Sequence, residues 1–88
     1  MAIWFHHVEA DGNSSDYSVT DWVAAEKEAV DIVRAGLHYV CDITIEAKIN
    51  QLIYDGLWEE AVQYYNHYNT VKELILMREG CPVYKGGQ

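Results

Sequence analysis

Basic residues are scarce in this chain of 88 amino acids: six Lys and Arg stand against fourteen Asp and Glu, for a formal net charge of -8. Residues 1–60 hold twelve of the fourteen acids and only three of the six bases. Neutralising phosphate groups requires Lys and Arg, so this composition disfavours binding to nucleic acid or to an anionic membrane. It favours attraction to a basic protein partner, such as the nucleic-acid groove of an enzyme.

A cationic leader and a long apolar stretch are also lacking. Residues 1–7 have neither the charged region nor the apolar run of a secretory signal, and nothing in the sequence predicts a transmembrane helix. We therefore expect a cytoplasmic protein, in the host cytoplasm if the chain is phage-encoded. Because Cys41 and Cys81 form no framework of repeated spacing, both are expected to be free thiols in that reducing compartment.

Apolar residues, in contrast, are plentiful. Half of the chain is hydrophobic, with seven Tyr and three Trp, which is too apolar for intrinsic disorder. A chain of this length buries somewhat more than about 60% of the surface that its unfolded form exposes, which suffices for one core. We expect a single compact domain over 1–80 and a C-terminal tail over 81–88, mobile from 83 onward.

Aromatic and β-branched residues open the chain. Their alternation over 2–10 predicts a β-strand. The Asp11-Gly12 step, followed by Asn-Ser-Ser, is a strong signal for a hairpin turn when a second strand follows, which Tyr17, Val19 and Trp22 would form. The N-terminal part is therefore predicted to be a β-hairpin or a single strand.

The first helix has two competing starts. Thr20 can cap it, or the second strand can run to about Val23 first. In both interpretations a helix covers 26–35, with Gly36 as its left-handed C-terminal cap. Residues 37–45 then fit either a short strand or a helical stripe, and their β-branched residues favour the strand.

Two more helices are predicted after this ambiguous segment. Residues 46–54 form one, and Trp58 lies at the start of the next. A break near Asn69 is expected because Asn and Thr are poor helix formers, although the helical pattern continues to an end at Gly80. The predicted fold class is α+β and predominantly helical: an N-terminal β-hairpin or strand, about three helices, and a short strand at 38–45 as an alternative.

Gly56, Trp58, Ala61 and Tyr65 resemble, in type and spacing, the glycine, aromatic, alanine and aromatic positions of a tetratricopeptide repeat. The similarity covers about 20 residues, and Lys48 stands where that family has leucine. No second copy of the repeat follows. The resemblance therefore implies a generic helical hairpin.

Metal-ligand patterns are weak. His38 and Cys41 alone approach the spacing of a local zinc-binding pair, and no second pair accompanies them. Glu46-Ala47-Lys48, with Asp31 or Asp42 upstream, superficially matches the carboxylates and lysine of metal-dependent nucleases. Such an enzyme must also grip a polyanion, and six scattered cations offer no groove for it. We expect neither a metal nor a cofactor.

Motifs for nucleophilic catalysis are missing as well. Ser14, Ser15 and Ser18 lie in a turn-like region without a G-x-S-x-G context, and neither cysteine belongs to a reactive motif. There is no glycine-rich phosphate loop. The chain is predicted not to be an enzyme.

An acidic face around the first turn and the first helix is the main candidate for partner binding. Such a surface can imitate a phosphate backbone and occupy a cationic groove, with steering that weakens as salt rises. The alternative is a solvated face that only aids solubility. The acidic candidates are Glu9, Asp11, Asp16, Asp21, Glu26, Glu28 and Asp31.

Aromatic residues of the last predicted helix are the second candidate. Tyr65 and Tyr68 fit its apolar face beside Trp58, whereas Tyr64 and His67 are predicted to point away from it. Tyrosine is enriched at interface hot spots. We therefore interpret Tyr64, His67 and Tyr68 either as a partner surface or homodimer seam, or as ordinary helix packing.

The predicted function is that of a small, acidic, non-enzymatic inhibitor that occludes the basic, nucleic-acid-binding site of a larger protein, such as a nucleic-acid-processing defence complex. Phage anti-CRISPR and anti-restriction inhibitors are an analogy of functional class. One alternative is a homo-oligomerising helical module that associates through Trp58, Tyr65 and Tyr68, and a second is a small metal-dependent nuclease. Direct contact with nucleic acid or a membrane is not expected.

Overall fold

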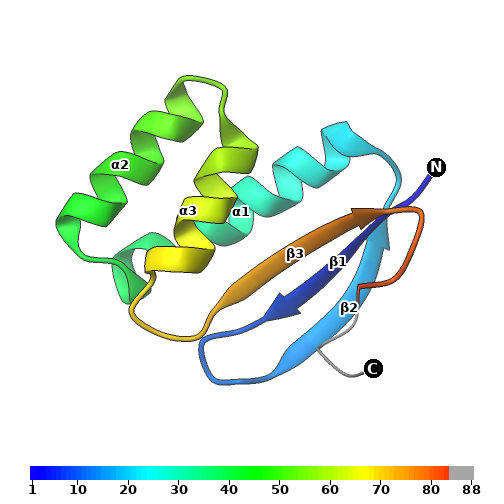
Figure 1. Ribbon diagram of the computed structural model, residues 1–88, viewed down its shortest axis with the longest axis horizontal. Coiled ribbons are helices and arrows are strands. Elements are labelled where there is room, and N and C mark those ends of the chain that lie inside the picture. Colours follow the sequence, from blue (N-terminus) through cyan, green and yellow to red (C-terminus); the bar gives the residue numbers. More distant parts are fainter. Residues whose placement is uncertain (84–88) are drawn as a thin grey trace.

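A three-stranded antiparallel sheet and three helices form the fold in the computed structural model, which describes residues 1–83 (Figure 1). The elements are β1 (Ile3–Val8), β2 (Ser14–Val19), α1 (Trp22–Val40), α2 (Ile43–Tyr54), α3 (Trp58–Tyr68) and β3 (Leu74–Glu79). The strand order is β2-β1-β3, so the last strand returns to the free side of the first. The α+β class and the N-terminal hairpin are confirmed. Of the tail predicted at 81–88, residues 84–88 lie outside the described residues.

The β1–β2 hairpin turns at the Asp-Gly step that the sequence indicates. Gly12 has a φ of +93°, a left-handed conformation that favours glycine. The Glu9 N–H donates to the Asn13 carbonyl at 2.7 Å, and Asp11 Oδ1 accepts from the Asn13 N–H at 2.9 Å. This loop holds two acidic side chains at one end of the sheet.

The core lies between the helices and one face of the sheet. Phe5 of β1 stacks on Tyr17 of β2 with ring centroids 5.3 Å apart, and the Tyr17 hydroxyl donates to Glu28 of α1 at 2.7 Å. These contacts fix α1 over the hairpin. The largest fully buried side chains are Ile3, Phe5, Val33, Ile49, Tyr65 and Ile75. Burying each large apolar side chain contributes about 1.5–3 kcal/mol, so these residues dominate the stability of the fold.

Helix α1 continues past Gly36 to Val40, so the predicted C-terminal cap at Gly36 is wrong. The glycine is explained by packing, because the Tyr65 phenol of α3 lies directly against it. A β-carbon at Gly36 would overlap with the Tyr65 hydroxyl and would lie 2.9 Å from Glu73 Oε1. The absence of a side chain, rather than a left-handed φ, is what this position requires.

The segment over 37–45 is helical, so the strand predicted there is wrong. Only Cys41 and Asp42 separate α1 from α2, and Asp42 Oδ1 accepts from the Ile45 N–H at 2.9 Å. This N-terminal cap outweighs the β-preference of the residues that follow it. Asp21 has the same role for α1 and accepts from the Ala24 N–H at 2.9 Å, which replaces the predicted cap at Thr20.

Residues 74–79 form strand β3, where the sequence pattern predicted a continued helix. The break near Asn69 is confirmed: α3 ends at Tyr68, and the Asn69 side-chain amide donates to the Tyr65 carbonyl at 2.7 Å and to the Glu73 carbonyl at 2.9 Å. Ile75 can be buried equally well by helical or by extended backbone. Pairing with β1 decides the outcome, because it satisfies the backbone of both strands.

Helices α2 and α3 form the expected helical hairpin, and Cys41 and Cys81 are both free thiols. In the described part of the chain, no helix is both long enough and apolar enough to span a bilayer.

We expect Gly36→Ala to lower the free energy of unfolding by about 1–3 kcal/mol, because the new methyl group overpacks the contact with Tyr65. This would occur although alanine is favoured over glycine inside a helix by about 0.5–1 kcal/mol. Urea denaturation gives the change. In a Tyr65→Phe background, which removes the overlapping hydroxyl, the cost should be smaller by about 1 kcal/mol. An equal cost in both backgrounds would contradict this explanation.

Candidate functional site

A groove of about 530 Å³ lies between α1 and the loop that joins β1 to β2. Ile32, Ala35 and Tyr39 of α1 provide an apolar wall. Among residues 1–83, no Lys or Arg lines this groove. The carboxylates that line it are Glu9, Asp11, Asp31 and Glu73. Because they come from the loop, from α1 and from the segment before β3, the anionic character of the groove depends on the tertiary fold.

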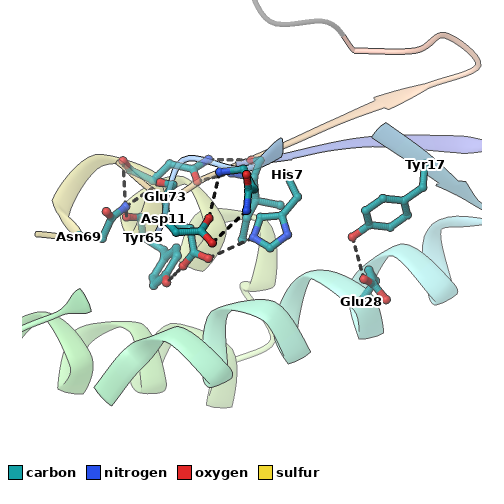
Figure 2. A network of polar contacts seen from close by, with 10 residues as sticks. His7, Asp11, Tyr17, Glu28, Tyr65, Asn69 and Glu73 are labelled. Carbon is teal, nitrogen blue, oxygen red and sulfur yellow. Dashed lines mark hydrogen bonds and ion pairs between the residues drawn. The ribbon is translucent and has the colours of Figure 1, made fainter. Parts of the chain in front are cut away.

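Glu73 connects three elements beside the groove. Its side chain is nearly buried; one carboxylate oxygen accepts a hydrogen bond from the Tyr65 hydroxyl, and the other lies 3.1 Å from His7 Nε2 (Figure 2). The two partners offset the cost of removing the carboxylate from water. Glu73 therefore connects β1, α3 and the start of β3. It packs against α1 at Gly36, where the absence of a side chain leaves room for it.

Tyr65 remains a proton donor to Glu73 over a wide pH range. Burial raises the pKa of its phenol above the ordinary value, and the hydrogen bond and negative charge of Glu73 raise it further. Tyr17 behaves in the same way, because burial and then its contact with Glu28 raise its phenol pKa. Both phenols therefore stay protonated at neutral pH and donate their hydrogen bonds.

Three of the seven acidic residues predicted for partner binding line this groove. They are Glu9, Asp11 and Asp31. Asp31 also accepts a hydrogen bond from Lys27 at 2.9 Å, in a pair that is exposed on both sides. Exposed pairs of this kind contribute about 0–1 kcal/mol, so the Asp31 carboxylate can exchange its partner for another cation at little cost.

The other four acidic candidates lie outside the groove, and three of them have intramolecular partners. Asp16 of β2 lies 2.8 Å from His6 Nδ1, whereas Asp21 caps α1 and Glu28 accepts from Tyr17. Glu26 lines a second groove, between α1 and α2. The acids that sequence reasoning assigned to one face are therefore divided among the groove, the surroundings of β2 and the second groove between α1 and α2.

Glu73 and His7 are the groove residues that the acidic pattern did not identify. Glu73 was assigned to a helix continuing from α3, and only the strand pairing of β3 brings it beside β1. The break near Asn69 was the one available signal. His6 and His7 point to opposite faces of β1: His7 contacts Glu73 beside the groove, and His6 contacts Asp16.

The predicted aromatic residues gather in a different groove, of about 350 Å³, between α2 and α3. The ring centroids of Tyr64 and His67 each lie 4.4 Å from that of Tyr68. Tyr64 is half-buried and Tyr68 is 47% exposed, so their predicted orientations are wrong. Packing of α2 against α3 accounts for this, because Leu52 of α2 lines the same groove as Tyr64.

The face proposed for self-association is largely used inside the chain. Tyr65 is fully buried, and the Trp58 ring lies against Trp22 of α1 with centroids 6.3 Å apart. Of the three residues assigned to that face, Tyr68 is the exposed one.

The residues considered for metal-dependent or nucleophilic chemistry have structural contacts in the fold. Glu46 lies 3.1 Å from His38, and Asp42 caps α2. Burial, and then the charges of Asp42, Glu46 and Glu73, raise the pKa of the Cys41 thiol, which makes the thiolate nucleophile less available. Within 1–83, no three His, Cys, Asp or Glu side chains are arranged to share a metal ion.

Comparisons with protein-family models, with curated proteins and with solved structures found no match to the chain. The geometry of the groove is therefore the basis for a functional proposal. Carboxylates beside an apolar wall can bind a cationic side chain that has an apolar stem.

Stability should fall in alkaline solution. Tyr17 and Tyr65 have a higher pKa in the folded protein than in the unfolded chain, where phenols ionise near pH 10. Above that pH the unfolded state binds fewer protons, so the free energy of unfolding decreases, whereas below it the contribution is fully present. Urea denaturation from about pH 8 to about pH 11 measures the slope.

Phenylalanine at both positions should make this alkaline decrease smaller. The control is Tyr54→Phe, because Tyr54 is 87% exposed, and we expect it to leave the slope unchanged. If the doubly substituted protein lost stability as steeply as the parent, the two buried phenols could not be its source.

Proposed function

We propose that the chain is a non-enzymatic binding protein whose groove, between α1 and the β1–β2 loop, binds basic side chains of a larger nucleic-acid-handling protein and so occludes that protein's site. The observation that carries this proposal is the lining of the groove. Carboxylates from three separate parts of the chain meet there, and no Lys or Arg of residues 1–83 lines the groove. The cation nearest to them is Lys27, which pairs with Asp31 at the surface.

An arginine side chain fits the chemistry of this groove well. Its guanidinium donates to carboxylates in charge-assisted pairs, and its aliphatic stem can pack against Ile32 and Ala35. Tyr39 adds an aromatic ring that is 85% exposed and can stack on a guanidinium. Lysine would use the same charges but would lose the planar contacts.

A site that handles nucleic acid presents such basic residues in quantity. Cationic side chains that normally neutralise phosphates would be attracted to an anionic protein surface in the same way. A chain with a net charge of -8 has a long-range field suited to this competition. The proposed role is that of an inhibitor of a nucleic-acid-processing defence complex, acting in the host cytoplasm as anti-CRISPR and anti-restriction inhibitors do.

The test is binding to a panel of purified nucleic-acid-handling proteins, including RNA-guided nucleases and restriction enzymes, with duplex DNA as competitor. We expect at least one to bind, with an affinity that falls as salt rises from about 0.05 M to about 0.5 M, because the screening length shortens. DNA should compete for the same site. Absence of binding across the panel, or binding that is indifferent to both salt and DNA, would contradict the proposal.

Removing charge from the groove should weaken this binding specifically. We expect Glu9→Gln with Asp31→Asn to lower the affinity by about tenfold or more at low salt, which is about 1.4 kcal/mol. The control is Glu59→Gln with Glu60→Gln, which removes the same charge from the first turn of α3, outside the groove. Equal losses in the two proteins would show that net charge, rather than the groove, determines the affinity.

A further inference from the structure

The two outer edges of the sheet, β3 and β2, differ in whether another part of the chain bonds to their backbone. On β3, the Asn66 side chain of α3 donates to the Ile75 carbonyl and accepts from the Ile75 N–H, both at 2.8 Å. This amide occupies the position of a neighbouring strand, so helix α3 closes part of that edge. The edge of β2 lies on the other side of the sheet (Figure 1).

The backbone of β2 has outward-pointing groups that can be located from the pairing pattern. The Glu9 N–H bonds to the Asn13 carbonyl next to the strands, and hydrogen-bonded and non-hydrogen-bonded pairs alternate along an antiparallel ladder. Alternate residues from Ser15 onward therefore bond to β1. The N–H and C=O groups of the residues between them point away from β1. These residues are Ser14, Asp16 and Ser18.

Among the described residues, no side chain or backbone group is bonded to the backbone of Ser14, Asp16 or Ser18 from outside the sheet. Several of the usual protections of an edge strand are also absent from β2, although it carries the charge of Asp16. It contains no Lys and no Pro, and its pairing with β1 runs without a bulge over all six residues. Its side chains are mostly exposed. Such an edge can accept another strand.

The charges around this edge indicate the kind of strand that would fit. Asp16 lies on β2 itself, Asp11 precedes it in the loop, Asp21 follows it, and Glu28 contacts Tyr17 from α1. Residues 1–26 contain no Lys or Arg. Within the three strands the one such cation is Arg78 of β3, and β1 lies between that strand and β2. An added segment would therefore meet an anionic margin.

We propose that β2 accepts an extended, basic segment of the partner as a fourth strand, by β-strand addition. This inference rests on the proposed function and specifies how part of the partner is held. Backbone hydrogen bonds to Ser14, Asp16 and Ser18 supply the register, and Lys or Arg at alternate positions of the segment lie on the face of the sheet that carries the Asp16 carboxylate. A second copy of the chain is a poorer occupant, because antiparallel pairing about Asp16 would place its carboxylate opposite its own copy.

An amide-resolved titration tests this inference. The ¹⁵N-labelled protein is titrated with an acetylated and amidated peptide of sequence Lys-Val-Lys-Thr-Lys-Val, and in parallel with the same peptide carrying Glu in place of Lys. We expect saturable shifts of the Ser14, Asp16 and Ser18 amide protons with the basic peptide, and slower hydrogen exchange at these amides. The acidic peptide should cause neither change, and equal shifts with both peptides would overturn the requirement for a basic segment.

Substitution of Ser18 separates edge pairing from general charge attraction. Ser18→Pro removes an N–H that β1 does not use, and Ser18→Thr keeps that N–H with a favourable strand residue. We expect the proline to weaken binding of the basic peptide by about tenfold or more relative to the threonine. Equal binding by the two variants would overturn the inference. If the proline variant does not fold, the amide shifts of the unsubstituted protein decide the matter.

The outcomes distinguish this inference from the proposed function. Saturable shifts confined to the groove residues, such as Tyr39 and Asp31, would overturn strand addition and leave the groove proposal in place. A peptide that shifts neither set would count against both. Sedimentation of the protein as a dimer that Ser18→Pro dissociates would assign the edge to a second copy and would overturn the basic occupant.

Discussion

The buried carboxylate of Glu73 is the interaction on which the arrangement of this protein depends. It accepts a hydrogen bond from Tyr65 of α3 and contacts His7 of β1, and its own position precedes β3. A carboxylate is costly to remove from water, so it persists here only because both of its oxygens have partners. This arrangement also requires glycine at position 36 of α1, because no larger residue would leave space for the Tyr65 phenol.

The contacts of Glu73 also place its negative charge beside the groove. Glu73 brings a carboxylate to the groove from the far end of the sequence, beside the acids of the β1–β2 loop and Asp31 of α1. Asp16, Asp21 and Glu28 lie around β2, where they contact a histidine, cap a helix or accept a hydrogen bond. The groove and the β2 edge meet at the β1–β2 loop, whose acids line the groove and precede β2, and this is why we assign both to a basic partner.

The parts of the fold that sequence reasoning identified are those set by local signals. The Asp11-Gly12 turn, the α2–α3 helical hairpin and the break at Asn69 all follow from residues close together in the chain. The errors arise where distant contacts decide. Gly36 resembles a helix cap until Tyr65 is placed against it, and residues 74–79 fit a helical stripe until β1 offers them a strand partner. Glu73 was missed for the same reason, since its place beside the groove depends on that pairing.

The central claim is that the groove prefers a cationic ligand. Carboxyl-carbon NMR during titration with a hexa-arginine peptide tests it most directly, because this method reports on each acidic side chain separately. We expect saturable shifts at Glu9, Asp11 and Asp31, with little change at Glu59 and Glu60, and we expect these shifts to disappear as the salt concentration approaches about 1 M. Small shifts of equal size at every carboxylate would mean that the groove has no preference for a cationic ligand, and would contradict the claim.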